Sequence, residues 1–441
     1  MALDLSALRR IIADENRLLT GADIPAEYQS DVLGRVHGSA EALAFPLSTE
    51  EVSALLRYAH EQRVPVTPRG AGTNLVGSTV PLEGGIILDL SRMDRVLELD
   101  EDTMTVTVEP GMLLQDLQAY VEARGLFYPP DPGEKASSIG GNISTNAGGM
   151  RAVKYGVTRD YVRGLEVVLA DGTVMQVGGK QVKDASGLSL KHLLIGSEGT
   201  LAVITKCLLR LVPKPEASLS VLVPYADLKT GIQSVLTILR ANANPTAVEF
   251  MERKVVALGE RFCGVSYPRS DAGSYILLTF DGRSEEVTAN AARVRGALVK
   301  AVEAVSEQEP VDIVVPISRT ADFIRFINDL EARSGMQMVS FGHAGDGNVH
   351  LCVVRGERDE ETWQRELHEN MDRAYAEAYR LGGVASGEHG IGLSKRPYFL
   401  RQTAKENLQA MNAIKTALDP QHILNNGKSY LTGGNNNAGT F

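Results

Sequence analysis

Apolar positions in the first half of the chain recur with two periods, which predicts a mixture of helices and strands. Val52, Leu55 and Leu56 repeat at helical spacing after Ser48, and Ser48 with Glu51 has the form of a capping box at a helix N-terminus. Asp171-Gly172 predicts a two-residue hairpin turn, because glycine adopts positive φ without strain. Further elements are expected as a helix and extended lead-in over 1–30, strands near 64–66, 86–88 and 105–108, and a helix over 112–124.

The pattern changes after residue 212, where Pro213 and Pro215 exclude a continuing helix or a central strand. Beyond this point strands alternate with longer helices, which predicts one sheet covered by helices. The expected elements are strands at 218–223, 274–280 and 350–354, and helices near 226–240, 285–305 and 320–333. The chain is therefore expected to have an α+β fold in two domains that divide near residue 215. The glycine- and asparagine-rich residues 433–437 are expected to be a disordered tail.

Length, charge and cysteine content argue against several classes of function. A length of 441 residues suits two domains, and a net charge of -10 argues against nucleic acid or an anionic membrane as partner. Cys207, Cys263 and Cys352 stand far apart, which argues against a disulfide framework, a thiolate zinc site or an iron–sulfur cluster. Neither a signal peptide nor a membrane span is evident, so a cytoplasmic location is expected.

Three glycine-rich segments are candidates for ligand binding, at residues 68–77, 137–149 and 196–205. The first suits a pyrophosphate, because glycines allow close approach and point successive N–H groups at a ligand. Its third glycine comes too late for the usual NAD-binding loop. A flexible turn is the competing interpretation of the first segment, and a linker that of the second. Small side chains in the middle of a domain favour a backbone wrapped around a flat cofactor.

The second half of the chain contains histidines and a glutamate in glycine-rich surroundings. His343 and His350 lie in a glycine-rich stretch, with His343 expected in a turn and His350 at the start of the following strand. Glu388 and His389 lie between glycines further on. Two imidazoles and a carboxylate suit a divalent metal such as zinc, iron(II) or manganese. Hydrogen-bonded structural histidines are the competing interpretation.

In this order and spacing, the three glycine-rich segments resemble the FAD domain of the vanillyl-alcohol-oxidase superfamily. The resemblance implies two α+β subdomains that hold an extended FAD. It implies non-covalent FAD, because covalent members carry a histidine in the first loop and this chain has Thr73-Asn74 there. The implied FAD contacts are Pro68, Arg69, Gly70, Ala71, Gly72, Thr73, Asn74, Leu75, Gly77, Asp131, Pro132, Ser137, Ser138, Gly141, Asn142, Ser144, Thr145, Asn146, Ala147, Gly148, Glu198, Gly199, Val203, Ile204 and Asn425.

The histidine segments resemble the C-terminal domain of FAD-linked D-lactate, glycolate and D-2-hydroxyglutarate dehydrogenases. By this resemblance His343, His350 and Glu388 hold the metal, and His389 is the base. Arg319 binds the substrate carboxylate, and Asn348 and Lys395 are further catalytic candidates; for Lys395 a solvated surface position is the alternative. Asn425-Asn426-Gly427-Lys428 resembles the segment that closes beside the flavin, although the usual proline after the first asparagine is missing.

The resemblance implies an FAD-binding domain at 1–215, a substrate domain with the metal site at 216–405, and a segment at 406–441 that returns to the flavin. The implied reaction oxidises a small D-2-hydroxy acid, with D-lactate or glycolate favoured and D-2-hydroxyglutarate as the alternative. Electrons then pass to an external acceptor, such as electron-transferring flavoprotein, a quinone or an iron–sulfur subunit. The rival functions are a flavin reductase of a sugar-nucleotide precursor and a non-catalytic flavin electron-transfer subunit.

Overall fold

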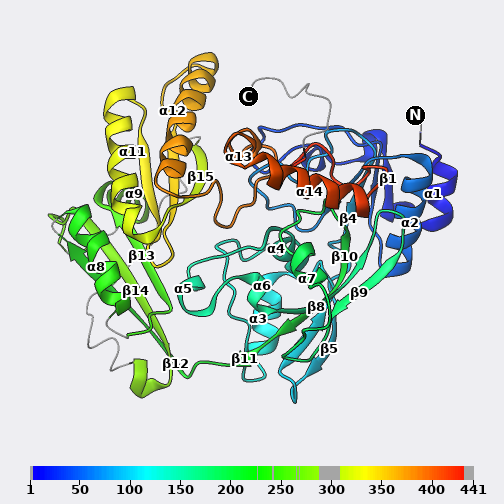
Figure 1. Cartoon of the computed structure of the whole chain (residues 1–441), viewed down its shortest axis with the longest axis horizontal. Coiled ribbons are helices and arrows are strands. Elements are labelled where there is room, and N and C mark those ends of the chain that lie inside the picture. The colour runs from blue at the N-terminus through cyan, green and yellow to red at the C-terminus, as the bar shows by residue number, and fades with distance from the viewer. Residues whose placement is uncertain are drawn as a thin grey trace. The chain divides into compact units, whose positions relative to one another are not determined.

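The computed structural model describes residues 3–225, 227–240, 243–264, 266–267, 269–287 and 308–431. These residues divide into two compact units (Figure 1). The first unit takes in residues 3–147, 157–213 and 388–431, and the second takes in 148–156 and 214–387. The chain passes from the first unit to the second directly after Pro213, where the sequence predicts a break. The expected helix near 285–305 and the expected tail at 433–437 lie mainly or wholly outside the described residues.

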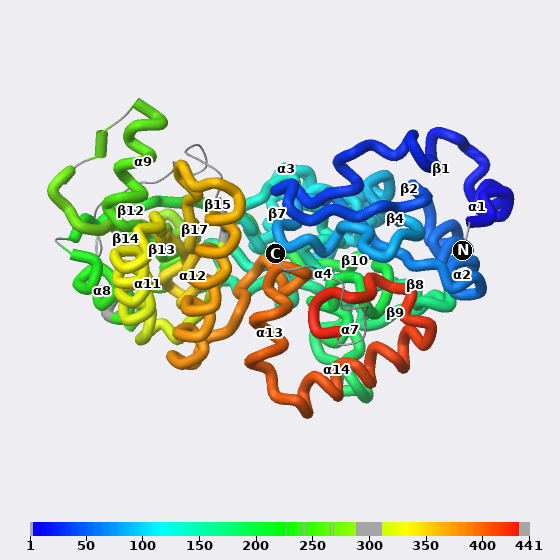
Figure 2. Tube along the Cα trace, turned by 90° about the horizontal axis from the view of Figure 1, so that it is seen from above, coloured from blue at the N-terminus to red at the C-terminus, as the bar shows by residue number. Residues whose placement is uncertain are grey.

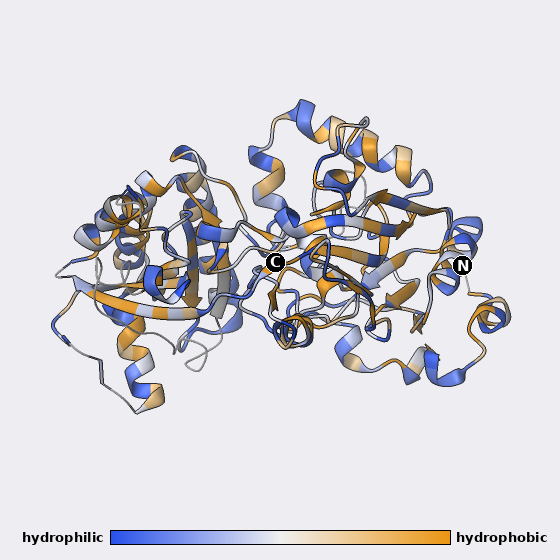
Figure 3. Ribbon diagram, turned by 90° about the horizontal axis from the view of Figure 1, so that it is seen from below, coloured by the Kyte–Doolittle hydropathy of each residue, from blue (hydrophilic) through white to orange (hydrophobic). Residues whose placement is uncertain are grey.

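Two larger sheets form the framework of the first unit. One has the order β1-β2-β4-β3, with β2 and β3 parallel to β4, and the other has the antiparallel order β5-β6-β10-β8-β9. Their strands are mostly apolar (Figure 3). The strands are β1 (Leu18–Thr20), β2 (Ala42–Ala44), β3 (Val66–Arg69), β4 (Ile86–Asp89), β5 (Val96–Asp100), β6 (Thr105–Val108), β8 (Val162–Val168), β9 (Val174–Gly178) and β10 (Val203–Arg210), with the short pair β7 (Leu126–Phe127) and β11 (Val212–Pro213).

The helices of the first unit pack on these sheets through apolar faces. α2 begins after Ser48, whose Oγ accepts from the N–H of Glu51 at 3.3 Å, while the Glu51 carboxylate accepts from Leu47 rather than closing the box on Ser48. Val52, Leu55 and Leu56 of α2 are buried in the core that α1 and the first sheet share. The helices are α1 (Leu5–Ile11), α2 (Thr49–Gln62), α3 (Leu114–Glu122), α4 (Ile139–Thr145), α6 (Thr158–Tyr161), α7 (Leu190–Leu194), α13 (Arg396–Gln402) and α14 (Lys405–Leu418).

Two local predictions in this unit need correction. The hairpin at Asp171-Gly172 is confirmed, but its loop spans three residues between Leu169 and Thr173, with Gly172 in the left-handed region at φ +84°. The second glycine-rich segment is not a continuous loop, because α4 forms inside it. Ser138 caps that helix by accepting from the N–H of Gly141 at 3.3 Å, and the small residues that follow pack closely instead of remaining irregular.

The second unit contains one antiparallel sheet of order β12-β14-β13-β16-β17-β15. α9 lies on one face of this sheet and α8, α11 and α12 lie on the other (Figure 2). The expected sheet covered by helices is thus confirmed. Its elements are β12 (Ala217–Tyr225), α8 (Leu228–Arg240), β13 (Ala247–Glu252), α9 (Arg253–Cys263), β14 (Ser274–Gly282), β15 (Gln308–Val314), η4 (Ile317–Arg319), α11 (Thr320–Ser334), β16 (Met338–His343), β17 (Asn348–Val354) and α12 (Glu360–Arg380), together with α5 (Ala152–Tyr155) from the first part of the chain.

No helix among the described residues is both long enough and apolar enough to cross a membrane.

Candidate active site

The first part of the candidate site is a cradle in which backbone hydrogen bonds join the three glycine-rich segments. The N–H of Ala71 donates to Ser138 Oγ at 3.2 Å, so the first segment contacts the N-terminus of α4. The N–H groups of Gly196 and Glu198 donate to the carbonyls of Ile143 and Ser144, at 3.0 and 2.8 Å. Segments separated by more than 50 residues in sequence therefore form one continuous backbone surface.

Glycine is required where the first segment meets the second. A Cβ on Gly70 would lie 2.1 Å from Ser138 Oγ, and that oxygen already accepts two N–H groups. Gly72 has φ +75°, and a Cβ there would lie 2.2 Å from the Arg69 guanidinium. These close approaches leave no room for side chains between the segments.

Glu198 is the centre of a hydrogen-bond network at the third segment. It is buried and has φ +50°, a left-handed conformation that is uncommon for a non-glycine residue. Its Oε2 accepts from Ser78 Oγ at 2.8 Å and from the N–H of Gly392 at 2.9 Å. Its Oε1 accepts from the N–H of Ile391 at 3.0 Å and from Ser429 Oγ at 3.2 Å. The Glu198 side chain therefore links Ser78, directly after the first glycine-rich segment, the backbone at 391–392 and the C-terminal segment through hydrogen bonds.

The C-terminal segment joins the same network. Asn425 Nδ2 donates to the backbone carbonyl of Glu198 at 2.7 Å. Lys428 is fully buried, and its Nζ donates to the carbonyls of Ser78 and Val80 and to Asn425 Oδ1 at 2.6–2.7 Å. Burial lowers the pKa of Lys428 from 10.5 to about 7. Buried polar contacts therefore tie the C-terminal segment to the rest of the first unit.

The exposed surface of this cradle fits an extended dinucleotide. Small residues remain partly exposed there, at Ala71, Thr73, Asn74, Gly141, Ser144, Thr145, Asn146 and Gly199. Asn74 is held in a turn, because its Oδ1 accepts from the N–H groups of Val76 and Ser78 at 3.0 Å each. A surface of small residues lets a flat ligand such as FAD approach the backbone closely.

Several residues from the implied FAD set have other contacts. The Arg69 guanidinium lies 4.7 Å from the centre of the Tyr28 ring and donates to the carbonyl of Glu27 at 3.4 Å. Asp131 forms an ion pair with Lys135. The Val203 side chain lies in the core of the first unit, and Gly148 belongs to the second unit. Any FAD contact from Val203 must therefore come from its backbone.

The second part of the candidate site is built on one face of the second unit's sheet. Phe341 pairs with His350 across β16 and β17, and Asp312 pairs with His350 across β17 and β15. Because side chains alternate along a strand, His343 lies on the same face as Phe341, two residues away. His343 is the last residue of β16 and His350 is the third of β17, so the prediction that His343 sits in a turn is wrong.

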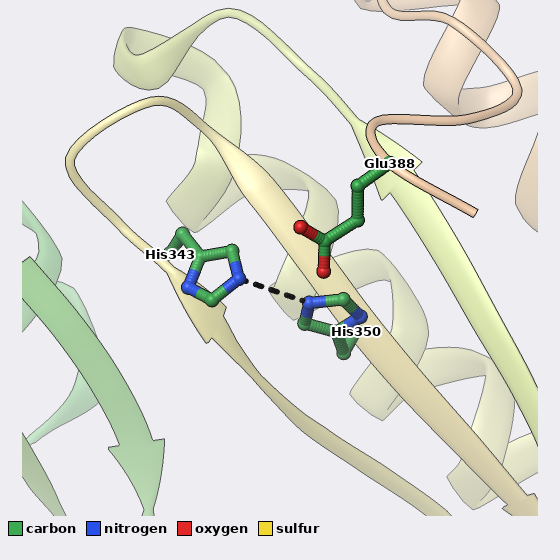
Figure 4. A group of neighbouring side chains, drawn as sticks. All are labelled: His343, His350 and Glu388. Atoms are coloured by element: carbon green, nitrogen blue, oxygen red, sulfur yellow. Dashed lines mark hydrogen bonds between the residues drawn. The ribbon is translucent and has the colours of Figure 1, made fainter. Parts of the chain in front are cut away.

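The two histidines and Glu388 form a cluster of donor atoms (Figure 4). The Nε2 atoms of His343 and His350 are 3.4 Å apart, and all three donor atoms lie within 4.8 Å of one another. Two nitrogens bound to one tetrahedral zinc ion, each at about 2.05 Å, would lie about 3.4 Å apart. The donor set and its spacing therefore fit a divalent metal.

Sequence patterns did not indicate Glu249, which supports this cluster from β13. Glu249 pairs with His343 across β13 and β16, and His343 Nδ1 lies 2.7 Å from Glu249 Oε2. Both side chains are only 13% exposed. The two residues are 94 positions apart, so no sequence spacing could have revealed the contact.

The backbone before Glu388 is held by a buried carboxylate on β15. Ser386 Oγ donates to Asp312 Oδ2 at 2.7 Å, and the N–H of Gly387 donates to both Asp312 oxygens at 3.0 Å. Asp312 is fully buried. Glu388 follows directly, so its position relative to the sheet depends on these contacts. Asp312 is a second supporting residue that sequence analysis missed.

The remaining catalytic candidates are spread over different elements. Asn348 is buried two residues before His350, and within the described part of the chain its Oδ1 has no hydrogen-bond partner. His389 follows Glu388 and is partly buried. Arg319 is the last residue of η4, and its side chain is 45% exposed. Its Nε lies 3.4 Å from Asp322 Oδ2. Lys395 is 3% exposed, so the alternative of a solvated surface lysine is wrong.

Comparisons with known proteins agree with this geometry. The FAD binding domain family matches residues 40–178, and the C-terminal domain family of FAD linked oxidases matches residues 214–310 and 308–429. A D-lactate dehydrogenase from Anaerostipes hadrus is 40% identical, covering 93% of this chain and 94% of the relative. The glycolate oxidase subunit GlcD from Bacillus subtilis is 38% identical, covering 95% and 93%.

A solved structure shows the same fold at low sequence identity. The p-cresol methylhydroxylase structure with substrate bound has a TM-score of 0.77 and 17% identity, and it covers 97% of this chain and 96% of the other. The superfamily resemblance of the glycine-rich segments and the α+β fold class are thus confirmed. The chain belongs to the FAD-linked oxidases of the vanillyl-alcohol-oxidase superfamily and is an FAD-dependent oxidoreductase.

Proposed function

We propose that this enzyme oxidises a small D-2-hydroxy acid to the corresponding 2-oxo acid, with the help of a divalent metal. The observation that carries the proposal is the donor cluster of His343, His350 and Glu388, together with the FAD cradle. Relatives named D-lactate dehydrogenase and glycolate oxidase subunit support D-lactate or glycolate as substrate. A 32% identical relative named probable D-2-hydroxyglutarate dehydrogenase makes that acid the alternative.

The proposed reaction removes two hydrogens from the substrate. FAD, when bound, would supply the redox chemistry, as the acceptor of the C2 hydrogen together with both electrons of the broken C2–H bond. The hydroxyl proton goes to His389, and the C2–O bond becomes a carbonyl. An external acceptor, a quinone or another redox protein, then removes the two electrons from the reduced enzyme.

Each residue has a defined part in this proposal. His343, His350 and Glu388 would hold a metal that polarises the substrate hydroxyl and makes its proton more acidic. Arg319 would bind the substrate carboxylate, because a guanidinium matches carboxylate geometry with two hydrogen bonds. Asn348 offers a buried side-chain amide beside the histidines, and Lys395 offers a buried cation.

The proposal is tested by rapid mixing of the enzyme with D-lactate, glycolate and D-2-hydroxyglutarate while flavin bleaching is followed. Metal content is measured on the same protein, before and after chelator treatment and after zinc or manganese is restored. Bleaching by one acid, lost with the metal and regained with it, is expected. Full bleaching in metal-free enzyme would contradict the metal's role, and no bleaching by any 2-hydroxy acid would contradict the substrate class.

A non-catalytic electron-transfer subunit is the rival function. Such a protein needs the FAD cradle but not a cluster of two imidazoles and a carboxylate. His343→Ala and His350→Ala separate the two functions, because in the proposed enzyme each should remove metal and turnover while FAD absorbance stays nearly normal.

A further inference from the structure

Glu249 has an unusual environment for a carboxylate in the second unit. Its side chain is 13% exposed, and its Oε2 lies 2.7 Å from His343 Nδ1. Oε1 is buried and has no hydrogen-bond partner within the described part of the chain. Burying a charged oxygen without a partner is unfavourable for folding. This arrangement therefore points to a role other than stability.

Glu252 provides the comparison on the same strand. It lies three residues along β13, so its side chain is on the opposite face of the sheet. Its Oε1 accepts from Asn328 Nδ2 at 2.8 Å, and its Oε2 lies 3.3 Å from Lys254 Nζ. Like Glu249 Oε1, Glu252 Oε2 makes no hydrogen bond within the described part of the chain. The two residues differ in partner, because Glu252 lies beside a lysine, as buried carboxylates usually do, whereas Glu249 lies beside a histidine.

We propose that Glu249 is a positioning residue that fixes the ring and the tautomer of His343 for metal binding. An ionised carboxylate only accepts hydrogen bonds, so the proton of a neutral His343 ring must lie on Nδ1. The lone pair is then on Nε2, the atom that lies 3.4 Å from His350 Nε2. Carboxylates commonly hold metal-binding histidines in this manner from outside the ligand set.

The sheet explains why the contact is rigid. Glu249 and His343 are direct partners across β13 and β16, Glu249 also pairs with Leu277 of β14, and β16 pairs with β17 up to Phe341, two residues before His343. His350 is held independently by stacking on Phe341, with ring centres 5.5 Å apart. The negative charge of Glu249 also adds to that of Glu388, which favours a divalent cation at the cluster. The inference rests on the proposed metal site.

The test measures zinc affinity by competition with a chromophoric chelator, using the FAD-loaded enzyme. Glu249→Ala should weaken zinc binding about 10- to 100-fold, the usual effect of removing such a partner. Glu249→Gln should fall between the wild type and Glu249→Ala, because its amide oxygen still accepts from Nδ1. Glu252→Gln is the matched control and should bind zinc within about twofold of the wild type. FAD absorbance and the far-ultraviolet spectrum confirm that each variant is folded.

The outcomes separate this inference from the proposed function. If the wild type binds no zinc or manganese, the proposed metal site fails. If the wild type binds zinc and Glu249→Ala binds it equally well, the positioning role fails while the metal site stands. A loss in Glu249→Gln as large as that in Glu249→Ala would show that the negative charge of Glu249, and not its hydrogen bond to Nδ1, strengthens zinc binding, and would overturn the positioning role.

Discussion

The Lys428 side chain is buried, and its Nζ donates hydrogen bonds to three protein oxygens instead of to water. Burial lowers its pKa from 10.5 to about 7. Between these values the unfolded chain keeps the proton and the folded chain releases it, so unfolding takes up a proton. The free energy of unfolding should therefore rise with pH between about 7 and 10, by at most about 1.4 kcal/mol per pH unit from this residue.

Lys428→Met tests this pH dependence. Urea unfolding at pH 7 and pH 9 should show that the stability difference between wild type and variant changes in favour of the wild type at the higher pH. Lys180→Met is the control, because hydrogen bonding to Asp100 raises the pKa of Lys180, and its contribution is lost only above pH 10.5. An equal difference at both pH values for Lys428→Met would show that Lys428 stays protonated throughout.

His389 is predicted to accept the hydroxyl proton, because it directly follows the proposed ligand Glu388. His389→Asn keeps a polar side chain of similar size but removes the base, so flavin reduction should slow roughly a hundredfold. Rapid mixing with substrate measures the rate, while FAD absorbance and metal content should remain at wild-type values. A variant that bleaches as fast as the wild type would exclude His389 as the base.

One oxygen atom, Ser138 Oγ, links the first glycine-rich segment to the N-terminus of α4. Ser138 Oγ caps α4 and also holds Ala71, and a Cβ on Gly70 would displace it. Gly70→Ala should cost about 1 kcal/mol of capping energy and weaken FAD binding about fivefold or more. Fluorescence titration of the FAD-depleted protein measures the affinity. Gly133→Ala, where a Cβ would meet nothing within 4 Å, should bind FAD normally.

Short sequence motifs predicted those elements that depend only on residues close to each other in the sequence. Ser48 and the apolar stripe of α2 were enough for that helix, and the turn chemistry of Asp171-Gly172 was enough for the hairpin. α4 was missed because glycine and asparagine have poor helix propensity, and its formation depends on the Ser138 cap and on packing. The roles of Glu249 and Asp312 depend on strand pairing between distant segments, which no local pattern reveals.

The three members of the donor cluster could be picked out because imidazole and carboxylate chemistry is visible in the sequence, whereas their geometry could not be predicted. Gly342 before His343, and Gly345 and Gly347 between the two histidines, suggested irregular backbone, yet both histidines belong to strands. Gly342 has φ +146°, and a Cβ there would lie 2.5 Å from the carbonyl of Asn348, so this glycine allows the strands to approach closely. The same residue type thus allows close approach of two strands here and close approach of two glycine-rich segments in the first unit.

The protein should bind FAD through non-covalent contacts alone, with no residue attached covalently to the flavin. The first glycine segment has Thr73-Asn74 where covalent relatives are expected to carry a histidine, and residues 68–77 contain no cysteine either. The purified protein should be yellow, and denaturation followed by ultrafiltration should release all the flavin into the filtrate. Added FAD should also raise the unfolding temperature of the FAD-depleted protein, because a ligand that binds only the folded state stabilises it by RT ln(1 + [FAD]/Kd). Flavin that stays with the denatured polypeptide would establish a covalent bond and require a different attachment residue.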